Sequence, residues 1–187
     1  MRALALATAA AIALAACAST ASDPAEVASL SALRERFGVP DCPETDPDAG
    51  AVPGGLPKTS LPCLGSTRQV NLAGLPRRPM VVNLWAQWCA PCRAEAAILK
   101  AVSDEQGVDF YGINYNDPKP DWALEFAALV GWRYSHIQDL DKQLAGPLNV
   151  PGLPLTLLVT ADGRIAHRHA GELHSAQELA SLIEEHL

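Results

Sequence analysis

The middle of the chain combines an almost continuous apolar run with a helical pattern that follows it. Residues 80–86, Met-Val-Val-Asn-Leu-Trp-Ala, are rich in β-branched and apolar side chains and predict a central strand. Residues 90–106 place Ala96, Leu99 and Val102 at helical spacing, which predicts a helix with these side chains directed inward.

The same order of elements repeats directly downstream. Residues 108–113 predict a second strand, and residues 121–130 predict a second helix. Trp122, Phe126 and Leu129 recur on one side of that helix, so we expect this side to face the core.

The last part of the chain carries a hairpin signal and a closing helix. Ala-Asp-Gly at 161–163 separates two apolar runs and is typical of a hairpin turn. Alternating strands and helices followed by a hairpin and a final helix indicate an α/β fold with a mixed sheet. The remaining predicted elements are an extended piece at 134–137, a short helix at 141–145, hairpin strands at 155–160 and 164–168, and a helix at 174–186.

The first residues have the pattern of an export signal. Arg2 supplies a positive charge, and residues 3–16 are almost entirely apolar but too short for a comfortable membrane-spanning helix. Leu-Ala-Ala-Cys, ending at Cys17, resembles the bacterial lipobox, in which the cysteine becomes the lipidated first residue of the mature protein. We therefore expect a lipoprotein anchored to the outer face of the bacterial cell membrane. The alternative is a cleaved secretory signal in which Cys17 falls near the cut.

A short helix and a long irregular segment follow the signal. Asp23 and Pro24 suit the cap and the first residue of a helix that Gly38 ends. Residues 40–62 are rich in Pro, Gly and Asp and predict a loop without strand or helix. We therefore divide the chain into a signal peptide at 1–16, a tether, helix and loop at 17–56, and a folded domain at 57–187.

Composition narrows the functional classes. With 49% hydrophobic and 19% charged residues, the chain is typical of a globular protein. A formal net charge of −7 without a basic run argues against nucleic-acid binding. His167 and His169 share one face of a strand, but an exposed polar face explains them more simply than a metal site. We expect no metal and no other cofactor.

Cys89-Ala90-Pro91-Cys92 opens the predicted helix at 90–106. The two sulfurs lie within one turn, and unpaired backbone N–H groups at a helix N-terminus stabilise a thiolate at the first cysteine. Cys89 is thus the expected nucleophile in thiol–disulfide exchange, and Cys92 the cysteine that resolves the mixed disulfide. A structural zinc site is the rival interpretation, but it usually needs a second pair of ligands at similar spacing.

Residues 81–95, Val-Val-Asn-Leu-Trp-Ala-Gln-Trp-Cys-Ala-Pro-Cys-Arg-Ala-Glu, resemble the active-site segment of thioredoxins. They are most similar to the TlpA/ResA-like family of membrane-anchored, extracytoplasmic thiol–disulfide oxidoreductases. Residues 150–156, Val-Pro-Gly-Leu-Pro-Leu-Thr, resemble that family's cis-proline segment. The resemblance covers about residues 57–187 and implies a thioredoxin-like fold, a central mixed β-sheet flanked by helices.

The resemblance also implies a substrate-binding surface around the dithiol. It points to Pro154 as the cis-proline facing the cysteines, and to the backbone of Leu153 as a partner for an extended substrate. The other expected substrate contacts are Trp88, Ala90 and Pro91. The family frequently has threonine after this proline where this chain has Leu155, a difference that we expect to affect packing or substrate choice. We also expect residues from Tyr111 to Asp117 to shape the substrate groove.

This chain lacks the buried acidic residue of thioredoxins, but it has a different acidic residue close to the dithiol in the sequence. The position six residues before Cys89 is Asn83, which cannot take a proton. Glu95, three residues after Cys92, matches an acidic position of the TlpA/ResA-like family. It implies a catalytic carboxyl that exchanges a proton with Cys92. The alternative is a solvent-facing helix glutamate.

The remaining cysteines predict a structural disulfide. If Cys17 carries lipid, four cysteines are left, and an even number is typical of exported proteins. With Cys89 and Cys92 as the redox-active disulfide, Cys42 and Cys63 pair by elimination and staple the loop between them. Two unpaired buried thiols are the alternative.

These observations favour an enzyme that reduces disulfides of selected exported proteins and receives electrons from a membrane donor protein. Cytochrome c maturation is a task that the resemblance alone implies. An oxidase with the same site is an alternative, because Cys-x-x-Cys spacing does not set the direction of exchange. A copper-carrying thioredoxin-like protein is a further alternative, which the spacing of Cys89 and Cys92 disfavours.

Overall fold

A computed structural model describes residues 24–105 and 107–187. The predicted signal peptide at 1–16, Cys17 and the tether up to residue 23 lie outside the described residues. Within the described part, no helix is both long and apolar enough to cross a membrane.

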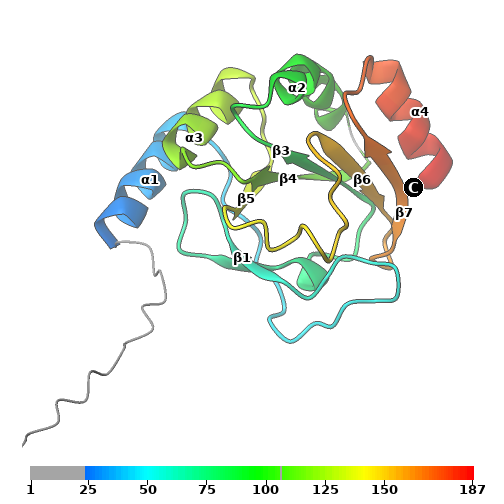
Figure 1. Ribbon diagram of the computed structural model, residues 1–187, viewed down its shortest axis with the longest axis horizontal. Helices are drawn as coiled ribbons and strands as arrows, with labels where there is room; N and C mark the ends of the chain where they lie inside the picture. The colour runs from blue at the N-terminus through cyan, green and yellow to red at the C-terminus, as the bar shows by residue number, and fades with distance from the viewer. Residues whose placement is uncertain (1–23, 106) are drawn as a thin grey trace, which may run out of the picture.

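Strands of the described chain form a central five-stranded sheet in the order β5-β4-β3-β6-β7 (Figure 1). Strands β3, β4 and β5 are parallel, whereas β6 pairs antiparallel with β3, and β7 pairs antiparallel with β6. The predicted mixed sheet is therefore confirmed. The strands are β3 (Met80–Trp85), β4 (Asp109–Tyr115), β5 (Ser135–Asp139), β6 (Leu155–Val159) and β7 (Ile165–Ala170).

Strand β3 lies in the middle of the molecule because both of its faces are covered. Val81 and Trp85 enter one hydrophobic cluster, while Met80, Val82 and Leu84 enter another on the opposite face. Every residue of the strand is buried, which explains why its sequence shows an apolar run rather than a strict alternation.

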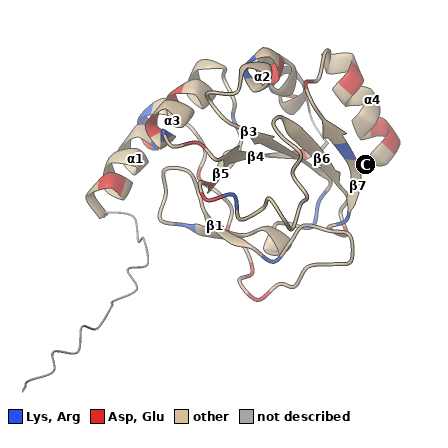
Figure 2. Ribbon diagram, viewed as in Figure 1, with Lys and Arg blue, Asp and Glu red and all other residues tan. Residues whose placement is uncertain are grey.

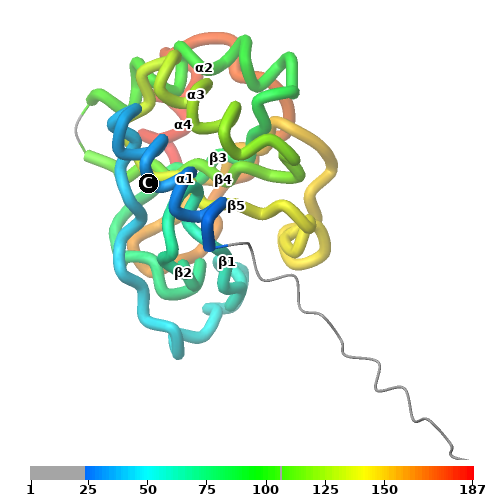
Figure 3. Tube along the Cα trace, turned by 90° about the vertical axis from the view of Figure 1, so that its left-hand side faces the viewer, coloured from blue at the N-terminus to red at the C-terminus, as the bar shows by residue number. Residues whose placement is uncertain are grey.

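Helices cover one face of the sheet, and irregular segments cover the other (Figures 1 and 3). The helical face consists of α1 (Pro24–Phe37), α2 (Ala90–Ser103), α3 (Pro120–Leu129) and α4 (Ala176–His186). The opposite face is covered by the two-stranded sheet of β1 (Ser60–Pro62) and β2 (Gln69–Asn71), by the 3-10 helix η1 (Leu72–Gly74), and by Leu144 and Leu148 of the turns after β5.

Three predicted elements differ from the observed ones. The loop expected at 40–62 ends in β1, which forms only because Leu61 pairs with Val70 of β2. Helix α2 ends at Ser103 rather than Gln106. The short helix expected at 141–145 is a series of turns, because Lys142 has a left-handed backbone with φ 57°.

The inward face predicted for α3 is also partly wrong. Phe126 is buried, but Trp122 is 56% exposed and Leu129 is 78% exposed. The small residues Ala123 and Ala127 turn inward instead. Neighbouring α1 packs on α3, and small side chains allow two helices to approach closely, so packing selected a different side of the helix.

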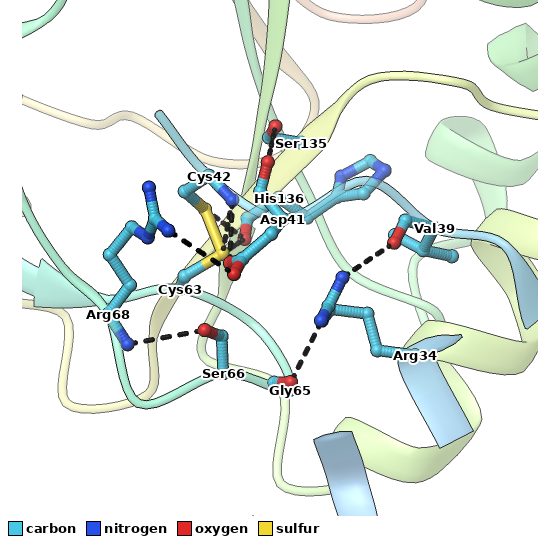
Figure 4. Close-up of a disulfide and its surroundings, with 10 residues drawn as sticks. All are labelled: Arg34, Val39, Asp41, Cys42, Cys63, Gly65, Ser66, Arg68, Ser135 and His136. Atoms are coloured by element: carbon cyan, nitrogen blue, oxygen red, sulfur yellow. Dashed lines mark hydrogen bonds and ion pairs between the residues drawn. A yellow bond between two sulfur atoms is a disulfide. The ribbon is translucent and has the colours of Figure 1, made fainter. Parts of the chain in front are cut away.

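A disulfide joins Cys42 to Cys63, in two segments that come before the central sheet in the sequence (Figure 4). Both half-cystines are buried, and their sulfurs lie 3.3 and 3.5 Å from the carbonyl oxygen of His136 in β5. The same carbonyl accepts a hydrogen bond from the backbone N–H of Leu64 at 2.8 Å. Nearby, the Ser135 hydroxyl donates to the carbonyl oxygen of Asp41 at 2.7 Å. The disulfide thus joins two irregular segments where they meet the edge of the sheet.

The expected division at residue 57 stays a prediction. Val39, Cys42 and Leu56 lie on its N-terminal side, and they are buried in the same two clusters as the sheet residues. Arg34 of α1 also donates to the carbonyl oxygens of Gly65 and Val39 (Figure 4). Described residues on both sides of position 57 therefore share one core.

Replacing Cys42 and Cys63 together with alanine is expected to lower the free energy of unfolding by about 3 kcal/mol, because the unfolded chain loses a cross-link across a loop of roughly twenty residues. Urea unfolding of both proteins with Cys89–Cys92 kept oxidised would measure the difference. An equal free energy of unfolding in the variant would contradict a stabilising role for this bond.

Candidate active site

The dithiol lies where the chain leaves the central strand β3 and begins helix α2. Strand β3 ends at Trp85, a short loop follows, and Cys89 caps the N-terminus of α2. Cys89 and Cys92 are joined by a disulfide, and the backbone N–H of Cys92 donates to Cys89 Sγ at 3.3 Å. On reduction, the same N–H and the positive end of the helix dipole would favour the thiolate form of Cys89.

The two cysteines differ in their access to solvent. Cys92 is fully buried, whereas Cys89 keeps 4% of its surface exposed beside Trp88, which is 51% exposed. Ala90 is exposed and Pro91 is half-buried. An incoming sulfur can therefore reach Cys89 only, and Cys92 can react only with a partner already bound to Cys89.

Sheet register brings Pro154 to the same place. Leu155 of β6 pairs antiparallel with Leu84 of β3, so Pro154 lies opposite Trp85, at the strand end from which the dithiol loop departs. The bond between Leu153 and Pro154 is cis, and the carbonyl oxygen of Pro154 accepts from the N–H of Gly171 at 3.0 Å. Leu153 is half-buried and contacts both hydrophobic clusters.

Glu95 is buried behind the dithiol, not directed to solvent. It follows Cys92 by one turn on the inner side of α2 and is fully buried. Its Oε1 accepts from Asn83 Nδ2 at 3.0 Å, and its Oε2 accepts from the backbone N–H of Leu173 at 2.9 Å. Asn83 also donates to Thr156 Oγ1 at 3.1 Å. The chain thus holds a carboxyl group in the core with hydrogen bonds from two sides.

Burial raises the pKa of Glu95 to about 7, although the hydrogen bonds from Leu173 and Asn83 act in the opposite direction. The negative charges of Glu172 and Glu178 add to the increase. Glu178 belongs to α4, Ala176–His186. This helix contains acidic residues and no lysine or arginine, and its last residue is a histidine (Figure 2). Glu95 can therefore gain or lose a proton near neutral pH.

The partners that hold Glu95 are not predicted by the sequence. Leu173 contributes only its backbone N–H, and Thr156 comes from β6, far away in the sequence. No residue type or spacing in the sequence predicts these contacts, because they depend on which strands pair.

The remaining tryptophans and histidines have varied surroundings. Trp85 is fully buried, and its indole N–H donates to His136 Nδ1 at 3.2 Å. His136 of strand β5 is fully buried, and burial lowers its pKa to about 3. Trp122, expected to face the core, is largely exposed instead.

Metal-ligand spacing occurs in the described residues only at Asp41, Cys42 and Cys63. The two sulfurs of this group are bonded to each other, so they are not available as thiolate ligands. His167 instead stacks on His186, with ring centroids 4.4 Å apart.

Comparisons with known proteins agree with this arrangement. A family model described as Redoxin matches residues 53–183. The thiol:disulfide interchange protein DsbE of Pseudomonas fluorescens biotype C is 36% identical over 117 residues, which are 62% of this chain and 65% of the relative. DsbE of Allochromatium vinosum is 33% identical over 132 residues, 68% of this chain and 72% of the relative.

Among solved structures, a secreted thiol-disulfide isomerase from Corynebacterium glutamicum is similar, with a TM-score of 0.61 and 26% identity. That similarity covers 69% of this chain and 85% of the other. The match to the Pseudomonas protein spans 65% of that relative's length, so its activity is not transferred to this chain by similarity alone.

Stability should depend on pH through Glu95. The pKa of Glu95 is about 7 in the folded protein, against an ordinary value of 4.5. Between these two pH values, Glu95 is therefore mostly protonated in the folded state and mostly ionised in the unfolded state. Glu95 therefore contributes stability that is fully present below pH 4.5 and is lost as pH rises to about 7, by about 3 kcal/mol. The lowered pKa of buried His136 acts in the opposite direction over part of this range, so the Glu95 contribution is the difference between the wild type and Glu95→Gln. Urea unfolding should find the wild type more stable relative to Glu95→Gln at pH 5 than at pH 8, by about 3 kcal/mol.

Exposed Glu125 of α3 supplies the matched control. A Glu125→Gln variant should keep the pH dependence of the wild type. An unchanged pH dependence in Glu95→Gln would show that Glu95 titrates normally in the folded protein.

Proposed function

The chain belongs to the redoxin family, and from this premise we propose that it is an extracytoplasmic thiol–disulfide oxidoreductase that reduces disulfides of selected exported proteins. One observation carries the proposal: Cys89 and Cys92 are joined at the N-terminus of α2, with buried Glu95 one turn behind them. The DsbE relatives, named thiol:disulfide interchange proteins, support the same class of reaction.

The proposed reaction has two exchange steps. In the reduced protein, the Cys89 thiolate attacks one sulfur of a substrate disulfide, and the other substrate sulfur leaves as a thiolate that takes up a proton. The Cys92 thiolate then attacks Cys89 Sγ and releases the second substrate sulfur. The substrate gains two electrons and two protons, and Cys89–Cys92 becomes the disulfide seen in the structure.

Glu95 is proposed to act as the proton acceptor in the second step. Cys92 is fully buried, so its thiol cannot pass a proton directly to water. A carboxyl group with a pKa of about 7, one helical turn away, can accept that proton at neutral pH and release it afterwards. Asn83 and Leu173 hold the carboxyl in place.

The substrate is proposed to bind as an extended segment across the dithiol. Trp88 and Ala90 are exposed, and Pro91 and Leu153 are partly so. Pro154 lies at the same sheet edge and would align the substrate backbone through Leu153. Such a surface suits a disulfide in an unfolded or flexible segment better than a buried disulfide of a folded protein.

Reduction is the proposed direction, with electrons from a membrane donor protein. It rests on the resemblance of residues 81–95 to the TlpA/ResA-like family, and cytochrome c maturation is the task which that resemblance suggests. The reduction potential distinguishes the directions. A value near ~−270 mV, as in thioredoxin, supports reduction, whereas one near ~−120 mV, as in a strong oxidant, would reverse the assignment.

A Cys92→Ala variant expressed in the native cells tests the reaction. Cys89 should accumulate in mixed disulfides with exported proteins, because no second thiol can resolve them. Non-reducing electrophoresis would show adducts that disappear with dithiothreitol. The matched Cys89→Ala/Cys92→Ala variant should form none, and adducts of equal amount in that double variant would rule out Cys89 as the nucleophile.

Membrane attachment through Cys17 is a separate part of the proposal. A Cys17→Ser variant should no longer incorporate labelled fatty acid and should move from the membrane to the soluble extracytoplasmic fraction, since an acyl chain supplies the anchor. If the variant stays in the membrane fraction, Cys17 is not the anchor. Because this residue is remote from the dithiol in sequence, thiol exchange by the released protein serves as the control for folding.

A further inference from the structure

The loop that carries the dithiol is bound to the end of the neighbouring strand. Trp85 of β3 pairs in parallel with Asn114 of β4, so the segments after these residues leave the sheet side by side. Two residues beyond β4 lies Asp117, which is fully buried. Its Oδ2 accepts from the backbone N–H of Gln87 at 2.8 Å, two residues before Cys89.

The Asp117 carboxylate is surrounded by donors. Besides Gln87, the side-chain amide of Asn114 donates to Oδ2 at 3.0 Å, and the backbone N–H of Lys119 donates to Oδ1 at 3.2 Å. A carboxylate accepts at both oxygens, whereas an asparagine in its place would present one NH₂ group to a donor. The three contacts therefore call for an acid at position 117.

A second bond joins the same two loops. The indole N–H of Trp88 donates to the carbonyl oxygen of Asn116 at 3.0 Å. Asn116 itself has a left-handed backbone with φ 51°, and its N–H donates to the carbonyl oxygen of Asp139 at 2.8 Å. Residues 87 and 88 are thus bonded to residues 117 and 116 in turn.

Gln87 is also held from the other side. Its carbonyl oxygen accepts from Arg93 Nη1 at 3.3 Å, and the Arg93 guanidinium lies 4.8 Å above the ring of Phe126. Both backbone polar groups of Gln87 are therefore paired, and the one on the sheet side depends on Asp117.

We propose that Asp117 is a positioning residue for thiol–disulfide exchange: its buried carboxylate holds Gln87 and thereby sets the placement of Cys89 and of the Trp88 ring on the substrate-binding side. The inference rests on the proposed function. Asp117 touches neither sulfur, so it acts through the loop. A loose loop would let Cys89 Sγ leave the N–H of Cys92 and would let Trp88 leave Asn116.

An Asp117→Asn variant tests the proposal, with Asp117→Ala as the stronger perturbation. The rate constant of the reduced protein with an oxidised peptide should fall about tenfold or more, since small misplacements of a reacting group are costly. Two further readouts should change: the pH–rate profile of Cys89 alkylation, and acrylamide quenching of Trp88 fluorescence, obtained by difference from the same variants carrying Trp88→Phe.

Asp139→Asn is the matched control. Asp139 is also fully buried, and its oxygens accept from the backbone N–H groups of Gln143 at 2.8 Å and Leu144 at 3.0 Å. The substitution changes only the side chain, which holds residues 143 and 144, and leaves in place the Asp139 carbonyl oxygen that accepts from Asn116. It should lower the urea midpoint about as much as Asp117→Asn and leave the Cys89 pH–rate profile as in the wild type.

The outcomes separate this inference from the proposed function. If the wild type does not exchange thiols with the oxidised peptide through Cys89, the proposed function fails. If the wild type reacts and Asp117→Asn keeps its rate and pH–rate profile, or Asp139→Asn changes both equally, the positioning role is wrong. A change confined to the Asp117 variants, with near-ultraviolet circular dichroism like that of the wild type, supports it.

Discussion

The pairing of β3 with a parallel strand on one side and an antiparallel strand on the other determines where everything else in this protein lies. The β3–β4 register places Trp85 beside Asn114, and the β3–β6 register places Leu84 beside Leu155. The dithiol loop, the loop with Asp117, and Pro154 therefore meet at one edge of the sheet. A shift by one residue in either register would turn the alternate side chains of β3 to the wrong face and separate these groups.

The buried carboxyl groups of this core accept hydrogen bonds from backbone N–H groups. The carboxyls of Glu95, Asp117 and Asp139 are fully buried, and each accepts from at least one backbone N–H. Hydrogen bonds of this kind offset part of the cost of removing a carboxylate from water. For Glu95 the offset is incomplete, and its pKa rises to about 7. The unfavourable burial of Glu95 near neutral pH is the same property that suits it to the proposed proton transfer.

Gly112 in β4 leaves room for the aromatic side chains of the core on the helical face of the sheet. A Cβ atom at Gly112 would lie 2.0 Å from His136 Nδ1 and 2.8 Å from Trp85 Nε1, so glycine allows these two rings to meet across β4. Trp132 packs edge-on against Trp85 and donates its indole N–H to the carbonyl oxygen of Ala96 in α2. Trp132 also packs against the ring of His136, so it links the helix that carries the dithiol to β5, while the backbone of His136 contacts the Cys42–Cys63 disulfide on the other side.

Local patterns in the sequence predicted the fold class and the dithiol, and the small number of cysteines predicted the pairing of Cys42 with Cys63 by elimination. The cis-proline at position 154 was predicted from the resemblance of residues 150–156 to a known family, because no local pattern marks a cis bond. Only the tertiary structure decided which side of α3 faces inward, that residues 141–145 form turns, and that residues 60–62 form a strand. Those outcomes depend on what packs against each segment: α1 beside α3, and β2 beside β1. The same holds for the surroundings of Glu95 and Asp117. Their partners Leu173 and Gln87 contribute backbone N–H groups, which every residue except proline possesses, so only the pairing of strands shows which ones they meet.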